Sequence, residues 1–480
     1  MITGKKFRIY PSGDQAKTLL QWIGHQRFIY NAKVQEDRYF RKFAHKALSL
    51  VGEQVPCDQQ YSQFKTEETA FLKEVPSQIL RNGAYRWMSA QQRFFKKLSG
   101  RPAIKKKSGR QSVMITRELF RFERIDAKTA NIHLGTDRRS IGSVLVKTHK
   151  DYEIPNSIYI SVHGGQWHVS FSNKGKTESA SEAELLKILQ YLPEGQLMDV
   201  STGFDRGVAV PVVSSDGRYY DYSEAQKKSF DQSIKGKKKW QRRFARRSKG
   251  SANRRKATAR IGVYDRKIAD IRNDFAHKTS KTIVDAPGSL LVFEDLKIKN
   301  MTASAKGTLE EPGKNVRQKA GLNKAILHSC WGRIKTYARY KGLKQNKLTV
   351  LIKAAYSSQE CSRCGCTNKD NRVTQSEFIC QDCGFICHAD ENASLVIKKR
   401  GVRDVLGDNI VIKEPKKIRF TKESIAKEAN PSTRRAGAVR TDANKPVSTP
   451  VERVLAVAAL KPLRSSRLKQ ETPTKTAIAV

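Results

Sequence analysis

The segment CQDCGFICHADENAS, Cys380 to Ser394, holds two cysteines at metal-binding spacing and, seven residues after the second cysteine, Asp390. A second CxxC pair lies fifteen residues upstream. Each pair forms a tight turn that presents two sulfurs to one tetrahedral ion, and Gly365 and Gly384 relieve the two turns. The spacing predicts a zinc ribbon over residues 356–386, closed and structural because every ligand is a thiolate. The predicted ligands are Cys361, Cys364, Cys380 and Cys383.

The other four of the eight cysteines lack this spacing. In a long basic chain, CxxC pairs favour thiolates on a metal over disulfides. We expect Cys366 and Cys387 to be spare thiols near the zinc site. Cys57 and Cys330 are expected to be ordinary buried residues.

Two carboxylates interrupt or end apolar strand-like runs, which is an uncommon position for an acid. Asp205 interrupts one such run, and Glu294 ends the run SLLVFE. Because a buried, unpaired carboxylate costs several kcal/mol, each acid must either meet a basic side chain or share a divalent cation. A single acid at a strand end is usually an exposed terminus. Together with Asp390 on a following helix, however, the order is that of a ribonuclease H-like metal site, whose oxygen ligands suit two Mg²⁺ ions.

Composition points to a nucleic-acid partner. The 480 residues include 92 Lys and Arg against 46 Asp and Glu, a formal net charge of +46, which suits a polyanion. The hydrophobic fraction of 38% supports folded domains rather than histone-like packing. No apolar run of about eighteen residues is present, and the N-terminus lacks the apolar core of a signal peptide. We therefore predict a cytoplasmic protein.

The first half of the chain changes from helical to strand-like patterns. Residues 6–10 alternate like a short strand, and residues 14–43 and 77–98 have apolar side chains at helical spacing. From about 112 to 172 the pattern predicts strands, with the glycine pair at 164–165 marking a hairpin.

The second half is expected to be mostly helical around a few strands. Residues 223–285 are predicted to be helical and contain the densest basic run, 235–250, which is better suited to a phosphate backbone than to a merely solvated helix face. Residues 321–342 are predicted to form one helix. Residues 415–480 lose the apolar pattern, and we predict that they are mostly disordered.

Five motifs, in order, resemble the TnpB family, the RNA-guided nucleases of insertion sequences, which are related to the miniature type V CRISPR effectors. They are GFDRGVAVPV, FEDLKIKNM, PGKNVRQKAGLNKAILHSCWG, YSSQECSRCG and CQDCGFICHADENAS. The resemblance covers roughly residues 5–400. It implies an α/β multidomain fold in which a RuvC (ribonuclease H-like) nuclease carries an inserted zinc ribbon, with a helical recognition lobe and a β-rich wedge domain at the N-terminal end.

The resemblance also implies a function and a site. The expected activity is RNA-guided endonuclease cleavage of double-stranded DNA next to a short flanking motif, by a transposon-encoded protein. The expected catalytic acids, which bind Mg²⁺, are Asp205, Glu294 and Asp390. The expected partners are a guide RNA from the protein's own locus and target double-stranded DNA, with no membrane and no obligate protein partner. The resemblance also implies a prokaryotic protein that associates with the nucleoid when it is on DNA. His388 stands where the family usually has an acid, and we expect it to be a neighbour of the site rather than a ligand.

The implied domain layout follows the chain. Its parts are a first wedge strand at 1–10, a recognition domain at 11–100, a wedge domain at 101–180, a first nuclease part at 195–355, the zinc ribbon at 356–386, a last nuclease helix at 387–402 and a basic, mostly disordered tail at 403–480.

Three alternatives stay open at this stage. A guide-dependent repressor on the same fold would be expected to lack at least one acid, whereas all three are present. A transposase would transfer strands with the same acids, but we recognise no separate end-binding domain and no helix-turn-helix. A CRISPR-associated effector of the same fold is separated poorly by sequence; whether a repeat array or a transposon end flanks the gene would decide.

Overall fold

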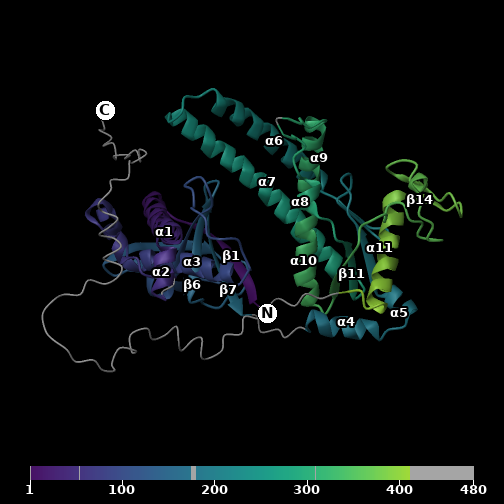
Figure 1. The fold of residues 1–480 in the computed structure, drawn as a ribbon, viewed down its shortest axis with the longest axis horizontal. Coiled ribbons are helices and arrows are strands. Elements are labelled where there is room, and N and C mark those ends of the chain that lie inside the picture. The colour runs from purple at the N-terminus through teal and green to yellow at the C-terminus, as the bar shows by residue number, and fades with distance from the viewer. Residues whose placement is uncertain (1, 53–54, 175–179, 309, 411–480) are drawn as a thin grey trace. The chain divides into compact units, whose positions relative to one another are not determined.

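The structure, a computed structural model, describes residues 2–52, 55–174, 180–308 and 310–410. The predicted disorder of residues 415–480 therefore lies outside the described residues. Two sheets with their covering helices, and a small hairpin, make up the described chain (Figure 1).

The N-terminal sheet is antiparallel and seven-stranded, in the order β2-β6-β7-β1-β5-β4-β3. Although β1 opens the chain, it lies between β7 and β5, with Phe7 opposite Val169 and Arg8 opposite Lys147. Alternation along β1 buries Phe7 and Ile9. The strands are β1 (Ile2–Tyr10), β2 (Gln111–Thr116), β3 (Phe120–Arg124), β4 (Thr129–Thr136), β5 (Arg139–Lys147), β6 (Ser157–His163) and β7 (Gln166–Lys174).

Two helices, α1 (Gly13–Tyr39) and α3 (Ser77–Phe95), pack against each other and against this sheet. Ser12 caps α1, because its hydroxyl accepts from the Gln15 backbone while the Gln15 side chain accepts from the Ser12 backbone. The shorter elements of this half are a π-helix (Phe40–Ala44), α2 (His45–Leu50) and three 3₁₀ turns (Ser62–Phe64, Glu67–Glu74 and Arg117–Leu119).

The second sheet is mixed and five-stranded, in the order β10-β9-β8-β11-β12. Strands β8, β11 and β12 are parallel, while β9 runs antiparallel to β8 and β10 antiparallel to β9. Because β8 and β11 are parallel neighbours, their carboxyl ends lie at the same edge of the sheet. The strands are β8 (Ser201–Asp205), β9 (Val212–Ser214), β10 (Tyr219–Tyr220), β11 (Leu290–Glu294) and β12 (Leu348–Ile352).

Helices cover both faces of this sheet (Figure 1). On one face α7 and α10 pack against Phe204 and Phe293, and on the other α4, α5 and α11 pack against Val292. Helices α6 and α7 form a long two-helix arm. The helices are α4 (Glu182–Gln190), α5 (Glu194–Asp199), α6 (Glu224–Ala245), α7 (Ala252–Asp285), α8 (Ile298–Met301), α9 (Val316–His328), α10 (Trp331–Leu343) and α11 (Ala389–Leu406).

Helix α11 crosses β8 and β11 so closely that glycine is required at two crossing points. A Cβ on Gly203 would lie 2.2 Å from the Ser394 carbonyl oxygen, and one on Gly401 would lie 2.4 Å from a Val292 methyl group. Real Cβ atoms do not approach other atoms this closely, so any larger residue would push α11 away from the strands.

The structure corrects three predictions. Residues 321–342 form two helices instead of one, because Cys330 adopts a left-handed conformation with φ of 60° between α9 and α10. Helix α11 continues to Leu406, with Val405 fully buried, so the first residues assigned to the tail belong to the helix. Cys330 is buried as expected, but Cys57 is exposed.

Candidate functional site

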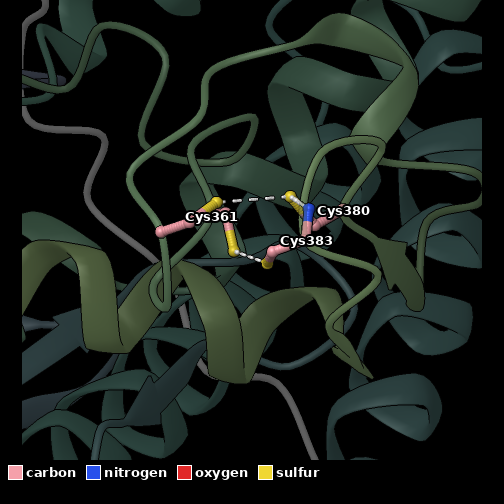
Figure 2. A group of neighbouring side chains, drawn as sticks. Cys361, Cys380 and Cys383 are labelled. Carbon is pink, nitrogen blue, oxygen red and sulfur yellow. Dashed lines mark hydrogen bonds between the residues drawn. The ribbon is translucent and has the colours of Figure 1, made fainter.

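The four predicted zinc ligands come together. Their sulfurs all lie within 4.8 Å of one another, with 3.7 Å between Cys361 Sγ and Cys383 Sγ and 3.6 Å between Cys364 Sγ and Cys380 Sγ. Zinc–sulfur bonds of about 2.3 Å in a tetrahedron place the sulfurs about 3.8 Å apart, so the cluster fits a zinc ion. Figure 2 shows the two cysteine turns facing each other across the site.

Backbone geometry shapes both cysteine turns in the same way. The N–H of Gly365 donates to the Cys361 carbonyl at 2.9 Å, and the N–H of Gly384 donates to the Cys380 carbonyl at 3.0 Å. Both glycines have positive φ, 81° and 67°, which favours glycine there. The Cys383 N–H donates to the Cys380 sulfur and lowers the pKa of that thiol to about 7, which favours the thiolate that a metal binds.

The ribbon is attached directly to the helix that carries Asp390. Its hairpin, β13 (Glu377–Ile379) and β14 (Ile386–His388), runs into α11 without a loop. The Asn392 side chain accepts from the Ser362 backbone at 2.8 Å and donates to the Glu360 carbonyl at 2.7 Å. Glu360 also forms an ion pair with Arg400 on α11. The folded ribbon therefore positions the first turn of α11.

The three candidate acids converge on one edge of the second sheet. Asp205 ends β8 and Glu294 ends β11, and the pleat turns both toward the α11 face because Phe204 and Phe293 point to the opposite face. Asp390 lies in the first turn of α11. Within the described residues, only the four cysteines form a group of three or more potential ligands whose ligand atoms all lie within 4.8 Å of one another. The carboxylate oxygens of the three acids are therefore neighbours but do not all lie within that distance.

The three acids lie close enough to affect one another's pKa. Burial, together with the nearby Glu294 and Asp390 carboxylates, raises the pKa of Asp205 to about 7. Burial also raises the pKa of Glu294, although the Ser357 hydroxyl donates to its carboxylate at 2.6 Å and opposes that shift. Carboxylates that are costly to ionise together fit a site for hard cations, which would compensate their charge.

Two arginines at this edge were missed by the sequence analysis. Arg372, from the ribbon segment between the cysteine pairs, forms an ion pair with Asp390 at 3.3 Å. Arg206, only 4% exposed, donates to the Glu294 carbonyl, and its Nε and Nη1 atoms have no partner among the described residues. Arg206 directly follows Asp205 and could have been noticed, whereas no spacing signal singles out Arg372.

His388 caps α11, because its Nδ1 accepts from the Asp390 backbone at 3.2 Å. The His388 imidazole therefore serves as the N-cap of α11 and lies next to Asp390 in the chain.

Asp205→Asn is expected to stabilise the protein in magnesium-free buffer at pH 8. The folded-state pKa of about 7 exceeds the unfolded value of about 3.9, so the unfolding free energy of the wild type falls as pH rises from about 4 to about 7. A neutral amide avoids this loss of unfolding free energy, which is about 2–4 kcal/mol for a pKa that rises from about 4 to about 7 on folding. Thermal melting should show the gain at pH 8 and its disappearance near pH 4. Asp199→Asn, at an exposed position, is the control, and equal melting of all three proteins at pH 8 would contradict the assignment.

Three family models match the chain. The model described as "Probable transposase" matches residues 200–305, which include Asp205 and Glu294. The model described as "Cas12f1-like, TNB domain" matches residues 331–397, which include the cysteine cluster and Asp390. A model described as "Helix-turn-helix domain" matches residues 1–38, where we recognised none from the sequence and where the structure has one strand and part of one helix.

The chain thus has an α/β sheet region that matches a probable-transposase model, and a four-cysteine cluster in a region that matches a Cas12f1-like, TNB domain model. The resemblance to the TnpB family is confirmed by these matches and by the similar proteins. The chain is 28% identical over 400 residues to "Putative RNA-guided DNA endonuclease InsQ" of Escherichia coli (strain K12), covering 82% of this chain and 91% of that protein. It is also 25% identical to "Putative RNA-guided DNA endonuclease" of Streptomyces pristinaespiralis, and this match covers 84% of this chain and 91% of that protein.

One solved structure, described as a Cas12f1–sgRNA–target DNA complex, matches with a TM-score of 0.49 and 12% identity, covering 83% of this chain and 98% of that chain. Within the described part of the chain, no helix is both long and apolar enough to cross a membrane.

Proposed function

We propose that this protein is a transposon-encoded, RNA-guided DNA endonuclease that hydrolyses phosphodiester bonds in double-stranded DNA next to a short flanking motif. The observation that carries the proposal is the convergence of Asp205, Glu294 and Asp390 from two parallel strand ends and one helix start. The names of the two similar proteins support the proposal that cleavage is guided by RNA. The chain covers 91% of the length of those two proteins. It covers only 57% of "CRISPR-associated endodeoxyribonuclease Cas12f1" of Sulfoacidibacillus thermotolerans, to which it is 25% identical. This difference in coverage favours the transposon-encoded type over the CRISPR-associated one.

In this proposal the three acids are the catalytic residues and hold Mg²⁺. Mg²⁺ held by these acids would supply activation of an attacking water and stabilisation of the charge that develops on the phosphate. Ser357 orients the Glu294 carboxylate through its 2.6 Å hydrogen bond. Arg372 balances the charge of Asp390. Burial of the Asp205 and Glu294 side chains limits solvent around them and so strengthens these interactions.

The domain layout predicted from the sequence fits into this proposal. Strand β1 pairs with β5 and β7, which supports grouping residues 1–10 with 101–180 as one wedge domain. Helices α1 and α3 would form the recognition domain, and the second sheet with α11 the RuvC-like nuclease. The zinc ribbon would lie between β12 and α11.

The guide would supply sequence specificity. Residues 241–250 carry most of the densest basic run and are almost all exposed, at the end of α6 and in the turn that follows. Such a surface binds phosphates without reading bases, because cations contact the backbone rather than base edges. Selection of a target would then come from pairing with an RNA, which we propose is transcribed from the protein's own locus.

Rewriting the terminal segment of the guide RNA should move DNA cleavage to the new complementary site. The protein should be purified with its locus transcript, assembled with original and rewritten guides, and the cut ends sequenced in the presence of Mg²⁺. We expect cuts only beside the flanking motif and only where the guide pairs. Cuts that stay at the original site, or that occur equally without RNA, would refute the RNA-guided function.

A further inference from the structure

A cavity of about 320 Å³ lies beside the candidate catalytic edge, between the start of α6, the end of α9 and the loop after β8. None of its lining residues belongs to the acid set. The loop contributes Val208 and Pro211, α6 contributes Phe230 and Asp231, and α9 contributes His328. This volume is at the lower end of the range of small-ligand sites, so it accommodates a single flat ring system rather than a larger ligand.

Two aromatic rings form a fixed corner in this cavity. The rings of Phe230 and His328 have centroids 4.6 Å apart and an interplanar angle of 85°. The Tyr222 hydroxyl donates to the His328 carbonyl at 2.7 Å and holds the end of α9 in place. Burial lowers the pKa of His328 to about 4, so its imidazole is uncharged at neutral pH. An uncharged corner of two rings favours contact with another flat aromatic ring.

The charged side chains that line the cavity offer a phosphate no unpaired cation. Asp221 and Lys227 neutralise each other through an ion pair of 2.8 Å, and Lys227 also pairs with Glu224. Asp231 is exposed and forms no hydrogen bond or ion pair with any described residue. A free carboxylate repels phosphate oxygens, but it accepts hydrogen bonds from the exocyclic amino groups of cytosine, adenine and guanine, which thymine lacks.

The loop that lines the cavity starts at the acid edge. Val208 follows Asp205 by three residues, so their Cα atoms are within about 11 Å. Gly207 lies against Asp390, since a Cβ added to it would be 3.8 Å from the Asp390 carboxylate. The Trp331 indole N–H donates to the Gly207 carbonyl at 3.0 Å and holds this loop against α10. At a rise of about 3.4 Å per nucleotide, the distance of about 11 Å between Asp205 and Val208 corresponds to about three nucleotides.

We propose that the cavity binds one nucleobase of the DNA strand held at the acid edge, at a position within about three nucleotides of the bond that is cut. The base contacts the Phe230–His328 corner, and its amino group donates to Asp231. This inference rests on the proposed nuclease function and adds to it a base-binding site that prefers amino-bearing bases. Neither ring touches the reacting atoms, so both are positioning residues for the substrate strand.

The test is a scan with abasic nucleotides on the cleaved strand. The complete protein is assembled with its guide RNA, and cleavage rates are measured for targets that carry one abasic site at each of five positions on either side of the cut. We expect one position within three nucleotides of the cut to lower the wild-type rate about tenfold, the effect of losing one stacked base. Phe230→Ala should lower the rate on intact DNA by a similar factor and show no further loss at that position.

Controls separate this inference from folding effects and from the proposed function. Phe230→Leu keeps most of the side-chain volume but removes the aromatic ring, so its cleavage rate should no longer fall when the sensitive position is abasic. The melting temperature of every variant should be measured as a check on folding. Tyr191→Ala, which removes an aromatic ring 89% exposed at the end of α4, should match wild type. Asp231→Asn should reduce the preference for cytosine over thymine at the sensitive position. Abasic losses that are unchanged in Phe230→Ala would overturn the base-binding site while leaving the nuclease function intact. An absence of cutting of intact DNA by wild type would overturn the function itself.

Discussion

Glu294→Ala is expected to lower the rate of guided DNA cleavage by about a hundredfold to a thousandfold, while binding of guide RNA and target DNA stays close to wild type. Glu294, which is 5% exposed, lies at the carboxyl end of β11 beside Asp205, and its side chain is directed to the same face as α11. Removing one ligand from a shared cation site removes stabilisation of the charge that develops on the phosphate, and single electrostatic groups of this kind cost about 10²–10³ in rate. Binding depends on the basic surface and not on this acid.

The matched control for this prediction is the next residue in the chain. Asp295 is an exposed carboxylate outside the proposed acid set, so Asp295→Ala should retain most of the cleavage rate. Asp205→Ala and Asp390→Ala should behave like Glu294→Ala. Rates should come from single-turnover cleavage, and binding from filter retention in magnesium-free buffer. Near-normal cutting by any of the three acid variants would remove that residue from the site.

Cys361→Ser should lower the zinc content from about one ion per chain to near zero and unfold the ribbon. Cys361 is 1% exposed and packs with Phe378, Cys380 and Ala389, so its loss disturbs the metal cluster and the small core together. A four-thiolate zinc site contributes about 10 kcal/mol or more to the folding of a small domain. Because the ribbon holds the first turn of α11 through Asn392, we also expect cleavage to be lost with the zinc.

Metal analysis and hydrogen exchange over residues 356–388 measure this effect directly. Cys57→Ser, at an exposed cysteine outside the cluster, is the control and should keep both its zinc and its exchange protection. Wild-type protein that contains no zinc and still shows full protection of the ribbon would refute the zinc site.

How far the acid site could be predicted depends on which contacts are local. Asp205 and Glu294 could be selected from sequence because an acid that interrupts or ends an apolar strand is costly and therefore conspicuous. That they meet was predicted only from the order of acids in a ribonuclease H-like site, because Asp205 and Glu294 are far apart in the chain and the parallel pairing of β8 with β11 brings them together. Ser357 and Arg372 carry no signal in a single sequence, because a serine or arginine in a loop is common at the surface.

Features that depend on short spacings could be predicted from the sequence, namely the four-cysteine cluster, the strand and helix types, and the basic character. A CxxC turn needs only a few neighbouring residues and a glycine, and helical or alternating patterns repeat within one element. Three features became visible only in the folded protein: the position of β1 inside the N-terminal sheet, the break at Cys330 and the cavity beside the acids. Each of these depends on contacts between residues far apart in the chain, and such contacts are selected by packing of the whole domain rather than by local preference.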